Sequence, residues 1–286
     1  MRFINPKTDF AFKKIFGDEQ NKDILISFLN AILYQGNSAI ESLEILNPYQ
    51  PPKIRGVKDT YLDIRAKLNN EQTVIIEMQV LNVEGFEKRI LYNAAKAYSI
   101  QLDTGEDYTL LNPVIALTIT DFEMFPNLDQ IISRFVLKEK DFLVDYLIYD
   151  IELVFVELPK FGKKLEELET LTDKWIYFLK NAKSLELVPE RMGDVQAIQK
   201  AFEVANRVGL TREELEDLEH QEIYIQDQRN AITKAVKQAV SQAVSQATKE
   251  KAIEIAKGLL DVLDEAMIAQ TTGLSIEEIQ KLKQAR

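Results

Sequence analysis

Hydrophobic and polar residues alternate most regularly along residues 61–80, YLDIRAKLNNEQTVIIEMQV. A period of two is typical of β-strands, in which successive side chains point to opposite faces. The polar residues 69–71 interrupt the alternation and predict a three-residue loop between two antiparallel strands. We therefore predict a β-hairpin in which Leu68 lies opposite Gln72 and Asp63 lies opposite Glu77.

The segments around this hairpin follow helical or strand patterns. Residues 18–34 and 84–102 carry apolar side chains at helical spacing and are predicted to be amphipathic helices. Strands are predicted at residues 42–46 and 113–120, and one or two more within 145–158. The order is helix, three strands, helix, strand, strand. This order predicts an α/β layer with a mixed sheet.

After Pro159 the pattern becomes helical and remains so to the last residues. We therefore expect three regions. Residues 1–160 form the α/β domain, residues 161–228 form a helical region, and residues 229–286 form an Ala-rich long helix with a small helical cap.

The Ala-rich helix carries alanines at positions 235, 239, 243 and 247 and valines at 236, 240 and 244. A strict period of four exceeds the 3.6 residues of a helical turn, so this stripe drifts around the helix instead of forming a heptad seam. Small residues allow close packing. The helix is therefore either a spacer or the contact of a homodimer, and the pattern leaves both open.

The segment DEAMIAQTTGLSIEEIQKL near the C-terminus predicts two short helices around a turn. Gly273 suits the position after the first helix, and Ser275 with Glu278 forms a capping box for the second. A DNA-binding helix-turn-helix is one interpretation. However, Glu277 and Glu278 would then face the DNA, which favours a packing or assembly cap.

The composition is that of a soluble globular protein. Of the 286 residues, 46% are hydrophobic and 28% are charged. The longest apolar runs are too short or too interrupted to span a bilayer, and MRFINPKTDF lacks the apolar segment of a secretory signal. We expect a cytoplasmic protein without a membrane partner.

The residue types that are missing narrow the chemistry. The chain has no cysteine and one histidine, which excludes thiolate nucleophiles and multi-histidine zinc sites within one chain. His220 lies in the acidic stretch EELEDLEHQEIYIQDQ and is interpreted as a solvated helix histidine. No glycine-rich phosphate-binding motif occurs. The candidate chemistry that is left after these exclusions is that of carboxylates with a hard metal ion.

The net charge of −11 does not exclude a nucleic-acid partner, because it is unevenly distributed. Residues 121–228 carry 24 acidic and 13 basic side chains. Residues 1–120 carry 15 acidic and 13 basic side chains, and residues 229–286 carry 7 acidic and 9 basic side chains.

Two directly opposed carboxylates in the hairpin repel each other. The alternation places Leu62, Ile64 and Ala66 on a core face and Asp63, with Arg65, on a polar face. Either one carboxylate stays protonated, or a divalent cation such as Mg²⁺ neutralises both. Alternatively, Asp63 pairs with Arg65 or Lys67 on a surface hairpin. Geometry alone leaves these alternatives open.

Residues 58–79 resemble the active hairpin of the PD-(D/E)XK nuclease superfamily, which places an Asp on one strand and Glu-x-Lys on the next. Four further segments resemble the recombination-promoting nuclease family, also described as PD-(D/E)XK nuclease family transposases: TDFAFKKIFG, FLNAIL, FEKRILYNAAKAY and TTGLS. The resemblance covers about residues 1–160 and, more weakly, the last thirty. It implies a restriction-endonuclease-like αβββαβ core with a mixed sheet, followed by an α-helical C-terminal region.

The resemblance also implies the roles of individual residues. Asp63 and Glu77 would bind Mg²⁺ or Mn²⁺, together with the backbone carbonyl of Met78. Gln79 occupies the position usually held by lysine, and a glutamine can orient a water only by hydrogen bonding. Lys58 or Lys13 would then supply the missing cation.

The helix after the hairpin is predicted to contact DNA. Arg89, Tyr92 and Lys96 share one face of it, and arginine binds phosphate at two points. The alternative is an exposed helix face without a partner. Asp9 and Lys13, one turn apart, would approach the metal from the N-terminal segment.

The leading hypothesis is a Mg²⁺-dependent DNA endonuclease that is associated with recombination or mobile elements. The alternative is a non-catalytic DNA-binding or self-assembling protein whose nuclease site has decayed at Gln79. Hydrolysis of RNA also stays open, because the protein groups required are the same.

Overall fold

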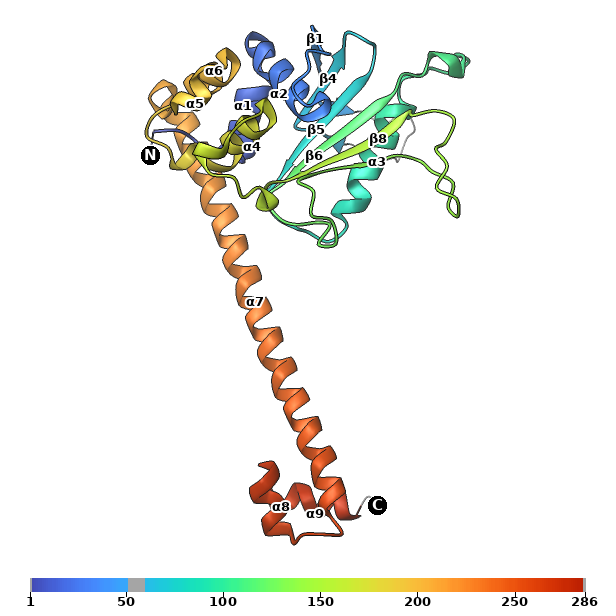
Figure 1. The fold of residues 1–286 in the computed structure, drawn as a ribbon, viewed down its shortest axis with the longest axis vertical. Coiled ribbons are helices and arrows are strands. Elements are labelled where there is room, and N and C mark those ends of the chain that lie inside the picture. The colour runs from blue at the N-terminus through green and yellow to red at the C-terminus, as the bar shows by residue number, and fades with distance from the viewer. Residues whose placement is uncertain (1, 51–59, 285–286) are drawn as a thin grey trace. The chain divides into compact units, whose positions relative to one another are not determined.

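The computed structural model describes residues 2–50 and 60–284 and divides into two compact units, Met1–Ile225 and Gln226–Arg286 (Figure 1). The first unit contains a six-stranded sheet. Its strands are β1 (Leu43–Leu46), β4 (Ile64–Leu68), β5 (Thr73–Gln79), β6 (Val114–Thr120), β7 (Ile132–Phe135) and β8 (Ile151–Glu157).

The strand order is β1-β4-β5-β6-β8-β7. The pairs β5–β6 and β6–β8 are parallel, and the remaining pairs are antiparallel. The predicted α/β fold with a mixed sheet is therefore confirmed. A separate two-stranded ladder joins β2 (Tyr49–Gln50) to β3 (Thr60–Tyr61).

Helices cover both faces of the sheet (Figure 1). One face packs against α1 (Asp9–Phe16), α2 (Lys22–Tyr34), α4 (Leu171–Asn181) and α6 (Gln196–Val204). The other face packs against α3 (Phe86–Ser99). Alternate side chains of β5 and β6 enter the two cores, as strand geometry requires.

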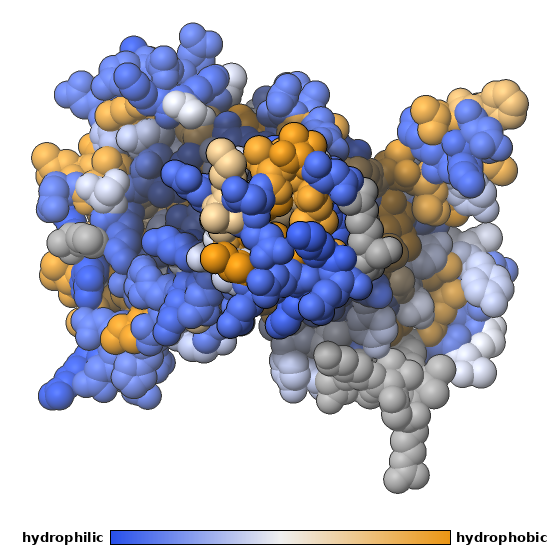
Figure 2. Space-filling view, turned by 90° about the horizontal axis from the view of Figure 1, so that it is seen from below, coloured by the Kyte–Doolittle hydropathy of each residue, from blue (hydrophilic) through white to orange (hydrophobic). Residues whose placement is uncertain are grey.

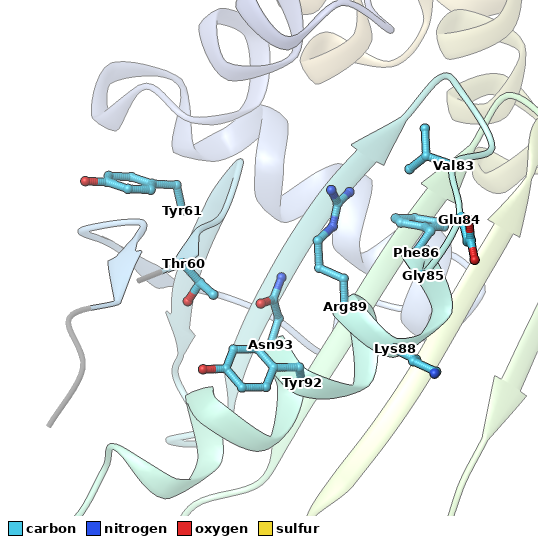
Figure 3. Close-up of a pocket in the computed structure, with 10 residues that line it drawn as sticks. All are labelled: Thr60, Tyr61, Val83, Glu84, Gly85, Phe86, Lys88, Arg89, Tyr92 and Asn93. Carbon is cyan, nitrogen blue, oxygen red and sulfur yellow. The ribbon is translucent and has the colours of Figure 1, made fainter. Parts of the chain in front are cut away.

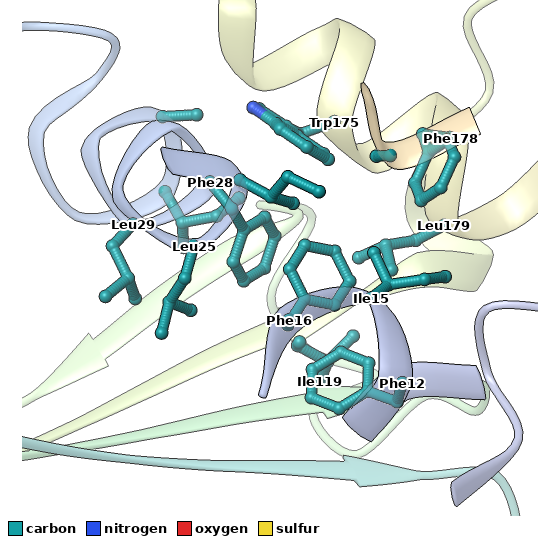
Figure 4. Close-up of a cluster of buried hydrophobic side chains, with 14 of the residues drawn as sticks. Phe12, Ile15, Phe16, Leu25, Phe28, Leu29, Ile119, Trp175, Phe178 and Leu179 are labelled. Atoms are coloured by element: carbon teal, nitrogen blue, oxygen red, sulfur yellow. The ribbon is translucent and has the colours of Figure 1, made fainter. Parts of the chain in front are cut away.

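An aromatic cluster fills the larger core (Figure 4). The rings of Phe16, Phe28 and Trp175 have centroid distances of 4.9 to 5.8 Å, in tilted and edge-on arrangements. Such pairs add to the stabilisation that burial provides. Ile119 of β6 reaches the same cluster, which therefore joins α1, α2 and α4 to the sheet.

The hairpin has the predicted register over its paired residues. Ile64 lies opposite Ile76, and the amide of Leu68 donates to the carbonyl of Gln72 at 2.8 Å. Glu71, the third loop residue, has a φ of 67° and closes the loop.

The first strand is shorter than predicted, and the expected position of Leu62 is wrong. Leu62 packs with Ile75, Ala94 and Ala97 on the α3 face, not with Ile64 on the larger core. The chain bends at Asp63, and Thr60 and Tyr61 form the separate strand β3, which pairs with β2. This bend interrupts the alternation that the sequence pattern extends through residue 63.

The edge strand β7 was not predicted. It has four residues and pairs antiparallel with β8. Alternation over so few positions is too weak a signal to separate a strand from a loop.

The connection from β7 to β8 exposes large hydrophobic side chains, among them Phe142 and Leu147. A space-filling view shows a largely hydrophilic face with hydrophobic groups in several separate places (Figure 2).

The second unit contains α7 (Arg212–Leu259) from Gln226 onward, together with α8 (Glu265–Thr272) and α9 (Ile276–Gln284). Its small core includes Ala256, Ile268 and Ile279.

Both predicted features of the turn between α8 and α9 are present. Gly273 has a φ of 75°, and the amide of Ser275 donates to Glu278 at 3.0 Å while the amide of Glu278 donates to Ser275 at 3.2 Å. The homodimer through the Ala-rich helix stays a prediction. None of the helices in the described part of the chain combines the length and apolar character needed to cross a bilayer.

Candidate active site

Asp63 lies at the bend that precedes β4 and is largely buried, with 20% of its side chain exposed. Its Oδ2 atom accepts a hydrogen bond from the backbone amide of Met78 at 2.7 Å. This contact joins the bend to β5. The position of the Asp63 carboxylate is therefore fixed by a hydrogen bond from the backbone of β5.

Glu77 projects from β5, with 12% of its side chain exposed. Its Oε1 atom accepts a short hydrogen bond from Nδ2 of Asn93 on α3. Helix α3 follows β5 in the chain and returns across the sheet, which brings Asn93 over Glu77. One oxygen of each carboxylate is thus held by an internal hydrogen bond.

The second oxygen of each carboxylate faces a cation at a longer distance. Lys13 Nζ lies 3.8 Å from Oδ1 of Asp63, and Arg89 Nη2 lies 3.7 Å from Oε2 of Glu77. Lys13 also pairs with Asp9 at 2.6 Å. Both cationic side chains are close to half exposed, so they can move without disturbing the core.

Burial raises the pKa values of both carboxyls. The pKa of Asp63 rises to about 7, chiefly because burial disfavours its charge. Repulsion from Asp9 and Glu77 adds to this rise, while the Met78 amide and Lys13 oppose it. For Glu77, burial raises the pKa and outweighs the opposing effects of Arg89 and Asn93.

Gln79 ends β5 and is engaged at both ends of its amide. Its Nε2 donates to the carbonyl of Leu81 at 2.7 Å, and its Oε1 accepts from Arg89 Nη2 at 2.7 Å. The glutamine thus holds the guanidinium group of Arg89 near Glu77. Arg89 also lies over the ring of Phe86, 5.1 Å from its centroid.

A bend and a strand therefore present two raised-pKa carboxylates, with an arginine and a lysine beside them. A family model described as PD-(D/E)XK nuclease family transposase matches residues 6–235. The chain belongs to this family. No curated protein and no solved structure matches the chain significantly.

The residues expected in a PD-(D/E)XK nuclease family transposase meet at this site only in part. Asp63, Glu77 and Gln79 are brought together with Arg89 and Lys13. These contacts connect α1, the hairpin and α3.

Lys96 does not join Arg89 at the opening of the site. It is buried, and its Nζ donates to the carbonyl of Gln50 at 2.8 Å. Tyr92 is partly exposed and lines a cavity beside the site. Lys58 lies outside the described residues.

The predicted set of residues does not include Asn93. It follows Arg89 by four residues, so both side chains project from the same face of α3. That spacing was a usable signal, since a polar residue one turn from a candidate phosphate ligand faces the same site. His220, interpreted as solvated, is exposed and lines a second cavity of about 540 Å³ together with Gln79 and Arg89.

The donor set suits a hard divalent cation. Carboxylate oxygens and a backbone carbonyl are ligands that Mg²⁺ accepts, and it retains several waters. Within residues 2–50 and 60–284, no group of three or more His, Cys, Asp or Glu side chains is placed to hold a metal. The ion would therefore depend on Asp63, Glu77, the predicted Met78 carbonyl and water.

Proposed function

We propose that this nuclease-family protein is a Mg²⁺-dependent DNA endonuclease with Asp63 and Glu77 as its metal ligands. The supporting observation is the arrangement of the two carboxylates. In each, one oxygen is fixed by an internal hydrogen bond and the other faces a half-exposed cation. A divalent cation would replace the weak contacts to Lys13 and Arg89 and leave the internal hydrogen bonds intact.

When bound, the metal ion supplies a water of lowered pKa and an electrostatic partner for the phosphate. The remaining tasks belong to the chain. Asp63 gives up its proton when it becomes a ligand, and burial raises the pKa of Glu77 in the same direction, so metal binding favours pH values at which both are ionised. Arg89, released from Glu77, is placed to hold phosphate oxygens with two parallel hydrogen bonds.

Gln79 is proposed to act through Arg89. Both ends of its amide are engaged, so we assign it the role of a positioning residue, in place of the water-orienting role expected from the sequence. The positive charge that a lysine would bring is supplied by Arg89 and Lys13. The expectation that a nearby lysine compensates for Gln79 is consistent with the position of Lys13.

The experiment is cleavage of supercoiled plasmid with Mg²⁺, Mn²⁺ or EDTA. We expect metal-dependent nicking that Asp63→Asn and Glu77→Gln each reduce at least a hundredfold, because either change removes an anionic ligand. Glu71→Gln is the matched control. Glu71 lies in the loop of the same hairpin and pairs with Lys67 of β4, away from the site, so we expect the rate to be unchanged. Nicking that persists in both site variants would overturn the proposal.

The alternative function is DNA binding without cleavage. The observation in its favour is Gln79, which stands where the related nucleases usually carry a lysine. This alternative predicts that the parent protein binds DNA but does not nick it with either metal. The association with mobile elements rests on the family description.

A further inference from the structure

A cavity of about 950 Å³ is lined by Arg89 and Asn93, the two partners of Glu77, and the proposed hydrolysis gives it no role. Thr60 and Tyr61 of β3 line one side, and Arg89, Tyr92 and Asn93 of α3 line the other (Figure 3). Its volume is in the range of small-molecule sites. The cavity is therefore large enough for a nucleoside.

Two tyrosines border this cavity. The ring of Tyr61 stacks on Tyr49, with a centroid distance of 4.9 Å and an angle of 30°, and yet 73% of Tyr61 is exposed. The stack orders the ring, and most of its remaining surface is available for contact. Tyr92 is partly exposed on the α3 side. Ordered aromatic rings of this kind are stacking surfaces for bases of single strands.

Asn93 contributes an unsatisfied acceptor. It is 2% exposed, and its Nδ2 donates to Glu77. Because a carboxylate only accepts, the amide must turn its nitrogen toward Glu77 and its Oδ1 away. Among the described residues that oxygen has no hydrogen-bond partner, and Figure 3 shows it directed toward the Thr60 side of the cavity.

A buried acceptor without a partner is unfavourable, and a ligand N–H group would relieve it. An unpaired nucleobase offers such a group on its Watson–Crick edge, whereas in a duplex that edge is occupied by the opposite strand. Arg89 lines the same cavity and lies 3.7 Å from Glu77. A nucleotide whose phosphate contacts Arg89 therefore has its base within reach of the tyrosines.

We propose that this cavity binds the base of an unpaired nucleotide next to the phosphate that is cleaved. Tyr61 and Tyr92 stack on the base, and Asn93 Oδ1 accepts its N–H group. The inference rests on the proposed nuclease function and narrows its substrate class to single-stranded DNA or unpaired regions of a duplex.

The test is equilibrium binding in EDTA, where cleavage does not occur. The probes are a labelled oligothymidylate, an abasic strand of the same length and a duplex. They are titrated with the parent, with Tyr61→Leu and with Tyr108→Leu, a matched control whose exposed tyrosine lies outside the cavity. The abasic strand retains the phosphates, so the difference between the two single strands isolates the base.

We expect the parent and Tyr108→Leu to bind oligothymidylate roughly tenfold more tightly than the abasic strand. Tyr61→Leu removes most of that preference and leaves the affinities for the abasic strand and the duplex unchanged. Equal affinity of the parent for the two single strands would overturn the inference, as would an undiminished preference in Tyr61→Leu. An intact base preference without metal-dependent nicking would overturn the proposed catalysis alone.

Discussion

Opposing influences act on the carboxyl group of Asp63. Burial and two neighbouring carboxylates favour its proton, while the Met78 amide and Lys13 favour its charge. Burial is the largest of these, so the pKa rises to about 7 from an ordinary 3.8. Ionisation of this buried carboxyl is unfavourable unless a cation neutralises the charge. This is the behaviour expected of a metal ligand.

This shift predicts how the stability of the metal-free protein depends on pH. The folded state keeps the Asp63 proton up to about pH 7, whereas the unfolded state loses it near pH 4. Between these values the folded state binds more protons, so raising the pH destabilises it. Relative to Asp63→Asn, the free energy of unfolding of the parent should fall by about 4 kcal/mol or less between these pH values. Above about pH 7 it should fall no further.

Urea unfolding in EDTA at several pH values measures this difference. Fluorescence of Trp175, the single tryptophan, reports the large core, in which it is fully buried. Glu71→Gln serves as the control for an exposed carboxylate. Parallel stability curves for the parent and Asp63→Asn would contradict the assignment of the raised pKa to Asp63.

At the scale of elements, three hydrogen bonds assemble the site, one within the hairpin and two between the hairpin and α3. The Met78 amide holds Asp63, Asn93 holds Glu77, and Gln79 holds Arg89. The last of these joins the end of β5 to the second turn of α3. A side chain on the strand thereby controls a cation on the helix.

This coupling is testable by a double-mutant cycle on the cleavage rate. Gln79→Leu removes the acceptor for Arg89, so we expect kcat to fall about tenfold or more with little change in KM. Arg89→Ala should lower the rate further. If Gln79 acts through Arg89, adding Gln79→Leu to Arg89→Ala changes nothing more. Additive losses would show that Gln79 acts independently of the arginine.

At the scale of the whole molecule, two cores of unequal size share helix α7. Leu218 of this helix is buried in the large core and Ala256 in the small one. The small core draws only on residues near the C-terminus. The contacts within each unit therefore predict that the second can unfold while the first stays folded.

Ile279→Ala tests this independence. Ile279 is fully buried in the small core, so its truncation should cost about 2–5 kcal/mol and melt the second unit at lower temperature. Circular dichroism should show an earlier loss of helix, while the Trp175 transition stays in place. Ile276→Ala is the control, because Ile276 is half exposed. A parallel shift of the Trp175 transition would show that the units unfold together.

Local features of this protein follow from its amino-acid pattern alone. Alternation and loop length set the hairpin register, which brings Asp63 near Glu77, and helical spacing located α2 and α3. Gly273 and the Ser275–Glu278 pair identified the C-terminal turn. These features depend on residues close together in the chain, where periodicity and turn chemistry act directly.

Contacts between distant groups depend on how the chain packs in three dimensions. It placed Leu62 on the α3 face, buried Lys96 against Gln50, and brought Lys13 to Asp63 from fifty residues earlier. Asn93 over Glu77 and Arg89 against Gln79 likewise depend on how α3 crosses the sheet. Periodicity predicts which face of an element a side chain occupies. The residue that it contacts on that face is set by the packing of segments remote in sequence, which no local pattern encodes.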